Sequence, residues 1–296
     1  MDALSESAKA QKKPTSLDWA KEQARKAKAA TEKSATEKPV QLFLPGMQRS
    51  YRAEPNHFGQ SSLFAPIARG RRTFLQDAEL VTRGSTTMRY TGEQLDEADA
   101  TLSMQLTFEA RCHPLGRPVT LNRAALLRAL GRTTGKDDYE WLHRRMKALT
   151  VATLFIETKK PDGTPKYSVG TSEAFHILQS FRYDDSAKSY TFTLDPRWSK
   201  LFSNREFSLI DMERRLQISR GQDMAKALQR LIATSSNSVQ RYRLEWLKGK
   251  MQYSGRMRDF HVALRRAMQE LIRVEIAANG RIEPNSKGKD QLTIWR

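Results

Sequence analysis

Basic and amide side chains recur on one side of a predicted helix near the C-terminus, at 255–278. An apolar series at helical spacing predicts the side that packs on a core: Met257, Phe260, Leu264, Ala267 and Leu271. At about 100° per residue, the opposite side carries Arg258, Val262, Arg265 and Gln269, with Arg266 and Arg273 beside them and Arg256 just before the series. Arginine can donate two hydrogen bonds to guanine in the major groove of DNA, and glutamine can pair with adenine. The spacing therefore predicts a helix that reads base edges.

A second predicted helix, from about Lys136 to Leu149, has the same division of faces. Its apolar series is Tyr139, Leu142, Met146 and Leu149. The opposite side carries Glu140, Arg144 and Lys147, with Trp141 and Arg145 on the flanks. This pattern predicts a second recognition helix. For any single arginine, an ordinary solvated helix face is an equally good interpretation, because exposed basic residues are common.

Basic residues also occupy two predicted β-hairpins. Segments 151–158 and 166–169 are rich in β-formers, and Pro161-Asp162-Gly163 between them indicates a turn. A later pair of strands, 281–283 and 291–295, surrounds a loop rich in lysine. We expect the basic residues of these hairpins to contact phosphate groups, which position a protein on DNA without reading its sequence. They are Lys159, Lys160, Arg281, Lys287 and Lys289.

The elements around these two helices occur twice in the same order: a helix, a short helix, a longer helix and a hairpin. The first series is predicted at 93–111, 123–130, 136–149 and 151–169, and the second at 210–233, 244–251, 255–278 and 281–295. This order is typical of a winged helix-turn-helix. The sequence therefore predicts an α+β fold with two tandem winged-helix domains, at 55–198 and 199–296. Residues 1–54 are predicted to form a disordered tail, because its first part has few large apolar side chains.

The net charge indicates a polyanionic partner. The 296 residues include 51 Lys and Arg against 33 Asp and Glu, a formal charge of +18. The last hundred residues carry 21 basic and 10 acidic groups, which makes them the most basic third. Nucleic acid is the most plausible partner for such an excess. The single Cys112 excludes an intrachain disulfide, and no apolar run reaches the length of a membrane span. We expect a soluble, cytoplasmic protein.

No residue pattern predicts catalysis, a cofactor or a metal site. The segment Gly131–Asp137 resembles a phosphate-binding loop, but it has three residues between its glycines instead of four, and Asp137 follows Lys136. The acidic cluster at Glu93, Asp96, Glu97 and Asp99 lies where a helix is predicted to begin, and the helix dipole favours carboxylates there. We therefore interpret these carboxylates as structural and expect a protein that is not an enzyme.

The sequence resembles the TrfA family of plasmid replication initiators from about Pro55 to the C-terminus. The residues that carry the likeness are Ser62-Leu63-Phe64, Tyr90-Thr91-Gly92-Glu93-Gln94-Leu95, Pro114-Leu115-Gly116-Arg117-Pro118-Val119-Thr120 and Tyr139 through Ala152. The resemblance implies tandem winged-helix domains that bind iterons, the repeated sites of a plasmid origin, as double-stranded DNA. It also implies opening of an adjacent AT-rich segment, with contact to single-stranded origin DNA, and a monomer–dimer equilibrium. The implied partners are the host initiator, the replicative helicase and the polymerase's sliding clamp.

An apolar segment follows the polar tail. It reads Gln41-Leu42-Phe43-Leu44-Pro45 and is similar to the Gln-Leu-x-Leu-Phe peptide by which bacterial proteins bind the sliding clamp. Such a peptide inserts leucine and an aromatic ring into an apolar pocket, and a disordered flank lets it order on binding. Pro45 stands where an aromatic residue is preferred. The alternative interpretation is a short strand or lid that packs on the folded part.

Two other functions fit the same composition. A winged-helix transcriptional repressor would share the fold and bind DNA, but it would need neither a clamp peptide nor two unlike DNA-binding units. A protein that packages nucleic acid would show no sequence preference.

Overall fold

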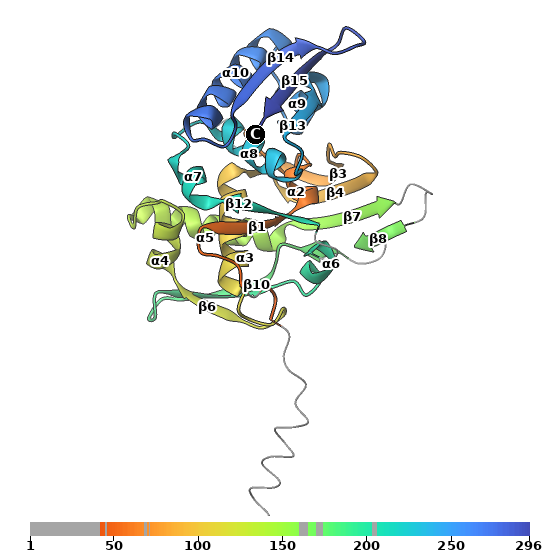
Figure 1. Ribbon diagram of the computed structural model, residues 1–296. Helices are drawn as coiled ribbons and strands as arrows, with labels where there is room; N and C mark the ends of the chain where they lie inside the picture. Colours follow the sequence, from red (N-terminus) through yellow and green to blue (C-terminus); the bar gives the residue numbers. More distant parts are fainter. Residues whose placement is uncertain are drawn as a thin grey trace, which may run out of the picture. The chain divides into compact units, whose positions relative to one another are not determined.

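The computed structural model describes residues 42–44, 46–67, 70, 72–159, 165–169, 174–202 and 206–296. The chain divides into two units, 1–41 and 42–296, and the description below concerns the second. This unit is α+β, with helices and several small sheets, which confirms the predicted class (Figure 1). Within the described residues, no helix is long and apolar enough to cross a membrane.

Residues 97–194, here the N-terminal half, contain a three-helix series and a hairpin. The series is α3 (Glu97–Ala110), β6 (Val119–Asn122), α4 (Arg123–Ala129) and α5 (Lys136–Val151). The hairpin is β10 (Leu178–Asp184) and β11 (Ser189–Leu194). β11 pairs with both β10 and β6, so the sheet has the order β10-β11-β6.

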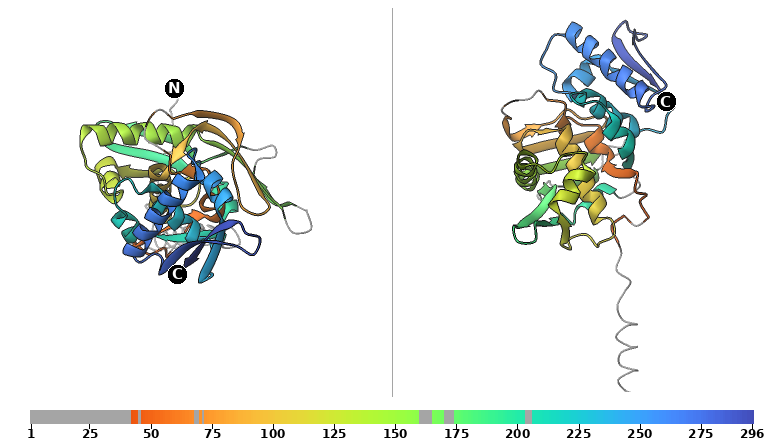
Figure 2. Two further views of the ribbon diagram at one scale, coloured as in Figure 1. Left: turned by 90° about the horizontal axis from the view of Figure 1, so that it is seen from above. Right: turned by 90° about the vertical axis from the view of Figure 1, so that its left-hand side faces the viewer.

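Residues 223–295, here the C-terminal half, repeat this order. The elements are α8 (Asp223–Ala233), β13 (Val239–Arg243), α9 (Leu244–Lys250), α10 (Met257–Arg273), β14 (Asn279–Pro284) and β15 (Asp290–Trp295). The sheet order is β14-β15-β13, so the second strand of the hairpin again pairs with the strand that precedes the short helix. Figure 2 shows α10 beside this hairpin at the periphery of the unit.

The hairpin that directly follows α5 belongs to a different sheet. β7 (Thr153–Lys159) and β8 (Pro165–Val169) pair with each other, and β7 also pairs with β4 (Thr86–Glu93). The complete order is β3-β4-β7-β8, with β3 at Phe74–Glu79 and the two-residue β9 (Phe175–His176) beside β7. The sequence predicted β7–β8 as the first wing. By sheet order, however, β10–β11 takes the position that β14–β15 takes in the C-terminal half.

Short elements connect the two halves. β1 (Tyr51–Pro55) pairs with β12 (Phe207–Asp211), and β2 (Phe64–Ala65) pairs with β5 (Leu95–Asp96). The remaining helices are α2 (Asn56–Gly59), α6 (Trp198–Phe202) and α7 (Met212–Gln217). The predicted tail, 1–54, therefore includes most of a strand that pairs with the folded unit.

Two separate hydrophobic cores lie within residues 42–296. The first extends in sequence from Ala53 to Phe202, and the second from Ile218 to Ile294. The predicted domain boundary after residue 198 thus falls inside α6, whose Leu201 and Phe202 still pack on the first core. A boundary between residues 207 and 218 agrees better with the packing.

Local interactions explain where α3 begins. The sequence predicted a helix from Glu93, but Glu93 ends β4 and the helix starts at Glu97. Asp96 lies in extended backbone and its carboxylate accepts hydrogen bonds from the amides of Ala98 (2.9 Å) and Asp99 (3.0 Å). The Asp99 carboxylate accepts one in return from the Asp96 amide, at 2.9 Å. This capping box satisfies amides that have no partner inside the helix.

Candidate nucleic-acid interface

The outward face of α10 carries exposed basic and amide side chains. Arg258, Arg265, Arg266 and Gln269 are all exposed. The guanidinium groups of the three arginines form no ion pair and no hydrogen bond with the described part of the chain. An arginine without an intramolecular partner keeps its five N–H donors for a ligand. The face can therefore offer forked donors to guanine edges or to phosphate groups.

The opposite side of α10 fixes this face in place. Phe260, Leu264 and Leu271 are fully buried in the second core, as the apolar series predicted. Met257 departs from the prediction, because it lies at the first turn and is 36% exposed. Glu270 accepts hydrogen bonds from Arg273 (2.6 Å) and from the Ser219 amide (2.5 Å). The bonds from Arg273 and Ser219 lower the pKa of Glu270 to about 2, although burial opposes this.

The β14–β15 hairpin adds basic groups beside α10. Its turn is held by Asn285, whose side chain accepts hydrogen bonds from the amides of Lys287 (2.9 Å) and Lys289 (3.1 Å). Both lysines are exposed, and the Lys289 ammonium lies 3.8 Å from Glu245. The Arg281 guanidinium lies 6.0 Å from the Trp295 ring centre. An ordered turn that carries exposed lysines is suited to contact with a phosphate backbone.

The first predicted DNA-binding helix, α5, presents a mixed face. Arg144 and Lys147 are exposed as predicted, but the Arg144 guanidinium lies 3.8 Å from the Glu140 carboxylate on the same face. Lys136 reaches Glu140 as well, at 4.0 Å. Exposed pairs of this kind are weak, at about 0–1 kcal/mol each. They nevertheless leave the α5 face with less uncompensated positive charge than α10.

Arg145, predicted on the flank of this face, is buried instead. Its guanidinium donates to both carboxylate oxygens of Asp99, at 2.5 and 2.9 Å, and to Glu93 at 3.1 Å. Burial and the neighbouring carboxylate of Asp96 raise the pKa of Asp99 to about 6, although Arg145 opposes this. Arg145 therefore ties α5 to the start of α3, with its guanidinium engaged by carboxylates.

A cleft of about 720 Å³ lies beside α5. Phe74 from β3 is 61% exposed at its edge, and Trp141 and Val151 line it together with Arg144 and Lys147. No local sequence pattern predicts that β3 lies next to α5, because β3 reaches this position through the sheet order β3-β4-β7. The cleft combines aromatic and basic groups on the predicted face.

Among the residues that the structure describes, the β10–β11 turn pairs its lysine with an acidic neighbour. In β10–β11, the turn carries Asp184 and Asp185, and Lys188 donates to Asp185 at 2.9 Å. In β7–β8, Lys160 lies outside the described residues, and the structure describes Lys159 by its backbone alone. The phosphate contacts predicted for Lys159 and Lys160 stay predictions.

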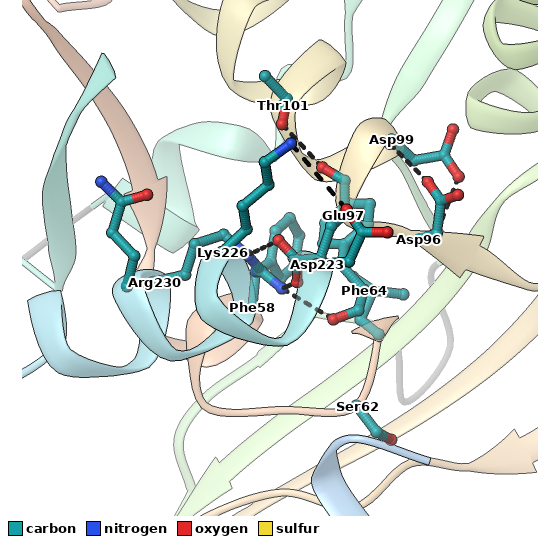
Figure 3. Close-up of polar contacts among 12 residues, drawn as sticks. Phe58, Ser62, Phe64, Asp96, Glu97, Asp99, Thr101, Asp223, Lys226 and Arg230 are labelled. Carbon is teal, nitrogen blue, oxygen red and sulfur yellow. Dashed lines mark hydrogen bonds and ion pairs between the residues drawn. The ribbon is translucent and has the colours of Figure 1, made fainter. Parts of the chain in front are cut away.

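A buried ion network joins the two halves. Arg230 of α8 donates to Glu97 of α3 at 2.7 Å and to the Phe64 carbonyl oxygen at 2.8 Å (Figure 3). It also donates to Glu54 of β1 at 2.8 Å. Arg215 of α7 donates to Glu97 at 2.8 Å. All four charged side chains are nearly inaccessible to solvent. Burial opposes ionisation of Glu97, but Arg230 and Arg215 outweigh it and lower its pKa. The joint network is defined by Glu54, Glu97, Arg215 and Arg230.

The predicted clamp-binding peptide lies partly on the folded unit. Gln41 and Pro45 are outside the described residues. The Phe43 amide donates to the His113 carbonyl at 3.1 Å and the Leu44 amide donates to the Arg111 carbonyl at 3.0 Å. The Phe43 ring contacts Phe202 edge-on, at 5.2 Å between centroids, whereas Leu42 is 38% exposed. Phe43 and Leu44 therefore occupy the packed position that the lid interpretation describes.

Among known proteins, solved structures resemble this chain in fold, whereas no family model or curated sequence matches it. A crystal structure of the selenomethionine derivative of domains 2 and 3 of RctB resembles the chain with a TM-score of 0.54 and 13% identity. The match covers 82% of this chain and 98% of that one. A second crystal structure of RctB domains 2–3 gives a TM-score of 0.48 at 12% identity, with coverage of 79% and 95%.

Proposed function

We propose that this protein is a plasmid replication initiator that binds repeated double-stranded sites of an origin through two tandem winged-helix domains. The observation that carries the proposal is the outward face of α10, where Arg258, Arg265 and Arg266 are exposed and have no partner within the described chain. Unpaired arginines on a helix that packs by its opposite face are what major-groove recognition requires.

The winged-helix assignment rests on order and pairing. Each half has a helix, a strand, a short helix, a longer helix and a hairpin. The second strand of the hairpin pairs with the strand that precedes the short helix. The wings are then β10–β11 and β14–β15. The likeness to RctB supports a tandem arrangement, because the matched fragment comprises two domains of that protein.

The role in replication rests on the resemblance to TrfA-like initiators. In this role the protein binds iterons, helps to open the adjacent AT-rich segment, contacts single-stranded origin DNA and recruits the host initiator and helicase in the cytoplasm. It does so without enzymatic activity or a cofactor, and a monomer–dimer equilibrium restrains it. These steps need binding energy and no bond-breaking chemistry.

Binding to origin DNA is tested with labelled duplexes. The protein should retard a duplex that carries the cognate repeats more strongly than a scrambled duplex of equal composition. The logarithm of affinity should fall linearly with the logarithm of salt concentration, because bound phosphates release counterions. Equal binding of both duplexes at physiological salt would contradict the proposal and indicate a nucleic-acid packaging protein.

A plasmid that carries only the origin separates an initiator from a repressor. When the protein is supplied in trans, replication of that plasmid supports the initiator. A repressor with the same fold would bind the DNA and leave the plasmid unreplicated. Direct repeats about two helical turns apart beside an AT-rich tract are the expected sequence of the origin.

Recruitment of the sliding clamp by residues 41–45 is a further part of the proposal. Because the amides of Phe43 and Leu44 are bonded to the end of α3, clamp binding requires these two residues to leave the folded unit. The double substitution Leu42→Ala and Leu44→Ala should abolish retention on immobilised clamp and leave binding to origin duplex unchanged. Retention equal to that of the wild type would disprove this part alone.

A further inference from the structure

The outward face of α10 contains two exposed apolar side chains, Val262 and Ile272, among its basic and amide groups, and Val262 is the more exposed of the two. Val262 is 60% exposed. It is not among the residues that pack on the second core. It follows Arg258 by four residues and precedes Arg265 and Arg266 by three and four. Residues at these spacings are neighbours on one helix face.

Neither helix formation nor packing accounts for a valine at this position. Valine is a poorer helix former than alanine, because its branched side chain loses rotamer freedom against the preceding turn. With more than half of its surface in solvent, Val262 adds little to the free energy of unfolding. A ligand that covers the face would bury this apolar surface.

Among the bases, only thymine presents a methyl group in the major groove. We propose that Val262 reads thymine in the bound site by packing on this 5-methyl group. The inference rests on the proposed binding of double-stranded DNA by α10. A cytosine in the same place would present an amino donor that valine cannot accept, and an unsatisfied donor at a buried contact is costly.

The neighbouring arginines fix where this thymine lies. Residues three and four positions apart are separated by roughly 4.5–6 Å along a helix axis. Successive base pairs are about 3.4 Å apart. When α10 lies along the groove, the thymine contacted by Val262 is therefore one or two base pairs from a guanine contacted by Arg265 or Arg266. The recognised sequence should contain this thymine–guanine spacing.

The test removes the methyl group without changing base pairing. A short duplex is selected by the wild-type protein from a randomised pool, and each thymine in it is replaced in turn by deoxyuridine. At one position the wild type should bind about three- to fivefold more weakly, the loss expected for about one buried methylene-sized group. Val262→Ala should bind the unmodified duplex with a similar loss of affinity relative to the wild type. Replacing the responsive thymine by deoxyuridine should not weaken its binding further. Thermal unfolding of Val262→Ala should not be lowered, because the side chain is exposed and alanine is the better helix former.

A second arm restores the methyl group on another base. The responsive T·A pair is replaced by C·G, and the cytosine is then replaced by 5-methylcytosine. The wild type should recover part of its affinity on methylation, whereas Val262→Ala should bind both duplexes equally. Leu216→Ala, which removes an exposed apolar side chain from α7 instead, should behave as the wild type in both arms.

Two outcomes would overturn the inference. In one, no thymine of the selected duplex responds to loss of its methyl group in the wild type. In the other, Val262→Ala keeps the wild-type response at every position. Both outcomes leave preferential binding of the selected duplex intact. Failure of the proposed function is different, because the selected and scrambled duplexes would then bind equally.

Discussion

The two halves of the folded unit share an order of elements but differ in the surfaces that their long helices present. On α10, three outward arginines have no partner within the described chain, and the adjacent turn carries exposed lysines. On α5, the outward arginine is close to Glu140, and the turn of β10–β11 pairs its lysine with Asp185. The same topology can therefore hold a face whose arginines are unpaired or one whose positive charge is partly compensated. If the proposed DNA binding holds, we expect the C-terminal half to supply most of the binding energy and the N-terminal half to make a weaker contact.

Substitution in the joint network should change the free energy of unfolding more than any other substitution proposed below, because the network holds the two halves together. Glu97→Gln removes the charge that Arg215 and Arg230 share. Loss of one member of a buried pair costs about 3–5 kcal/mol. Urea denaturation should show this decrease in the free energy of unfolding. Glu140→Gln, an exposed acid on α5, should change it by less than about 0.5 kcal/mol. Equal effects of the two substitutions would contradict a structural role of the network.

Replacement of Lys250 is expected to increase the free energy of unfolding, in contrast to replacement of Glu97. Its side chain is fully buried at the end of α9, and its ammonium has no hydrogen-bond partner within the described residues. Burial, aided by Arg230, lowers the pKa of Lys250 to about 7. The unfolded chain then binds more protons than the folded one between pH 7 and the ordinary lysine pKa, so stability rises with pH across this window.

Lys250→Met should consequently stabilise the protein by roughly 2–4 kcal/mol at pH 7 and below. The advantage should shrink as pH rises from 7 toward the ordinary lysine pKa and vanish above it, because the wild-type lysine is then neutral in both states. Thermal unfolding at several pH values measures the difference. Lys248→Met on the same helix serves as the control and should lack this pH dependence. A destabilised Lys250→Met protein would mean that the ammonium is satisfied by groups outside the described residues.

Recognition should depend more on α10 than on α5. Arg265→Ala should weaken binding of the cognate duplex by about 1–3 kcal/mol and relax its sequence preference. Arg144→Ala should cost less than about 1 kcal/mol, because Glu140 already compensates part of its charge. Titration of each variant with cognate and scrambled duplexes gives both quantities. A greater loss for Arg144→Ala would reverse the ranking of the two halves.

The smallest effect is expected at the wings. Lys287→Ala should weaken binding evenly across sequences and reduce the slope of log affinity against log salt by about 0.9, the value for one phosphate contact. Lys188→Ala should leave the slope unchanged, since Asp185 holds this lysine. Salt titrations of the two variants test the comparison directly. An equal change of slope in the two variants would mean that both wings contact phosphate and would contradict the expected difference between them.

Features that depend on neighbours along the chain were predictable. The core side of α10 was confirmed at Phe260, Leu264 and Leu271, and its hairpin was confirmed at 279–284 and 290–295. Helix and hairpin signals lie within a few residues of each other, so a local pattern can specify them. The prediction that Met257 would be buried was wrong, because the first turn of this helix projects beyond the core.

Features that depend on distant partners were missed. The last two residues of β12, Ile210 and Asp211, were predicted as the start of a helix. The strand was missed because it pairs with β1, more than 150 positions away in the sequence. The β7–β8 hairpin was predicted correctly as a hairpin, but its sheet is chosen by β4. Arg145 was placed at a surface because no local signal indicates that Asp99 would bury it.

The class of elements, their repeated order, the positive charge and the packed side of each long helix follow from the amino-acid sequence alone. Periodicity and composition encode these properties, and they act over a few residues. The three-dimensional fold is needed to establish which of the two outward faces keeps its charges free, which hairpin lies beside each helix, and how buried ion pairs join the halves. The physical reason is that the availability of a charged group depends on which residues the fold brings within a few ångströms of it, and most of those residues are remote in the sequence.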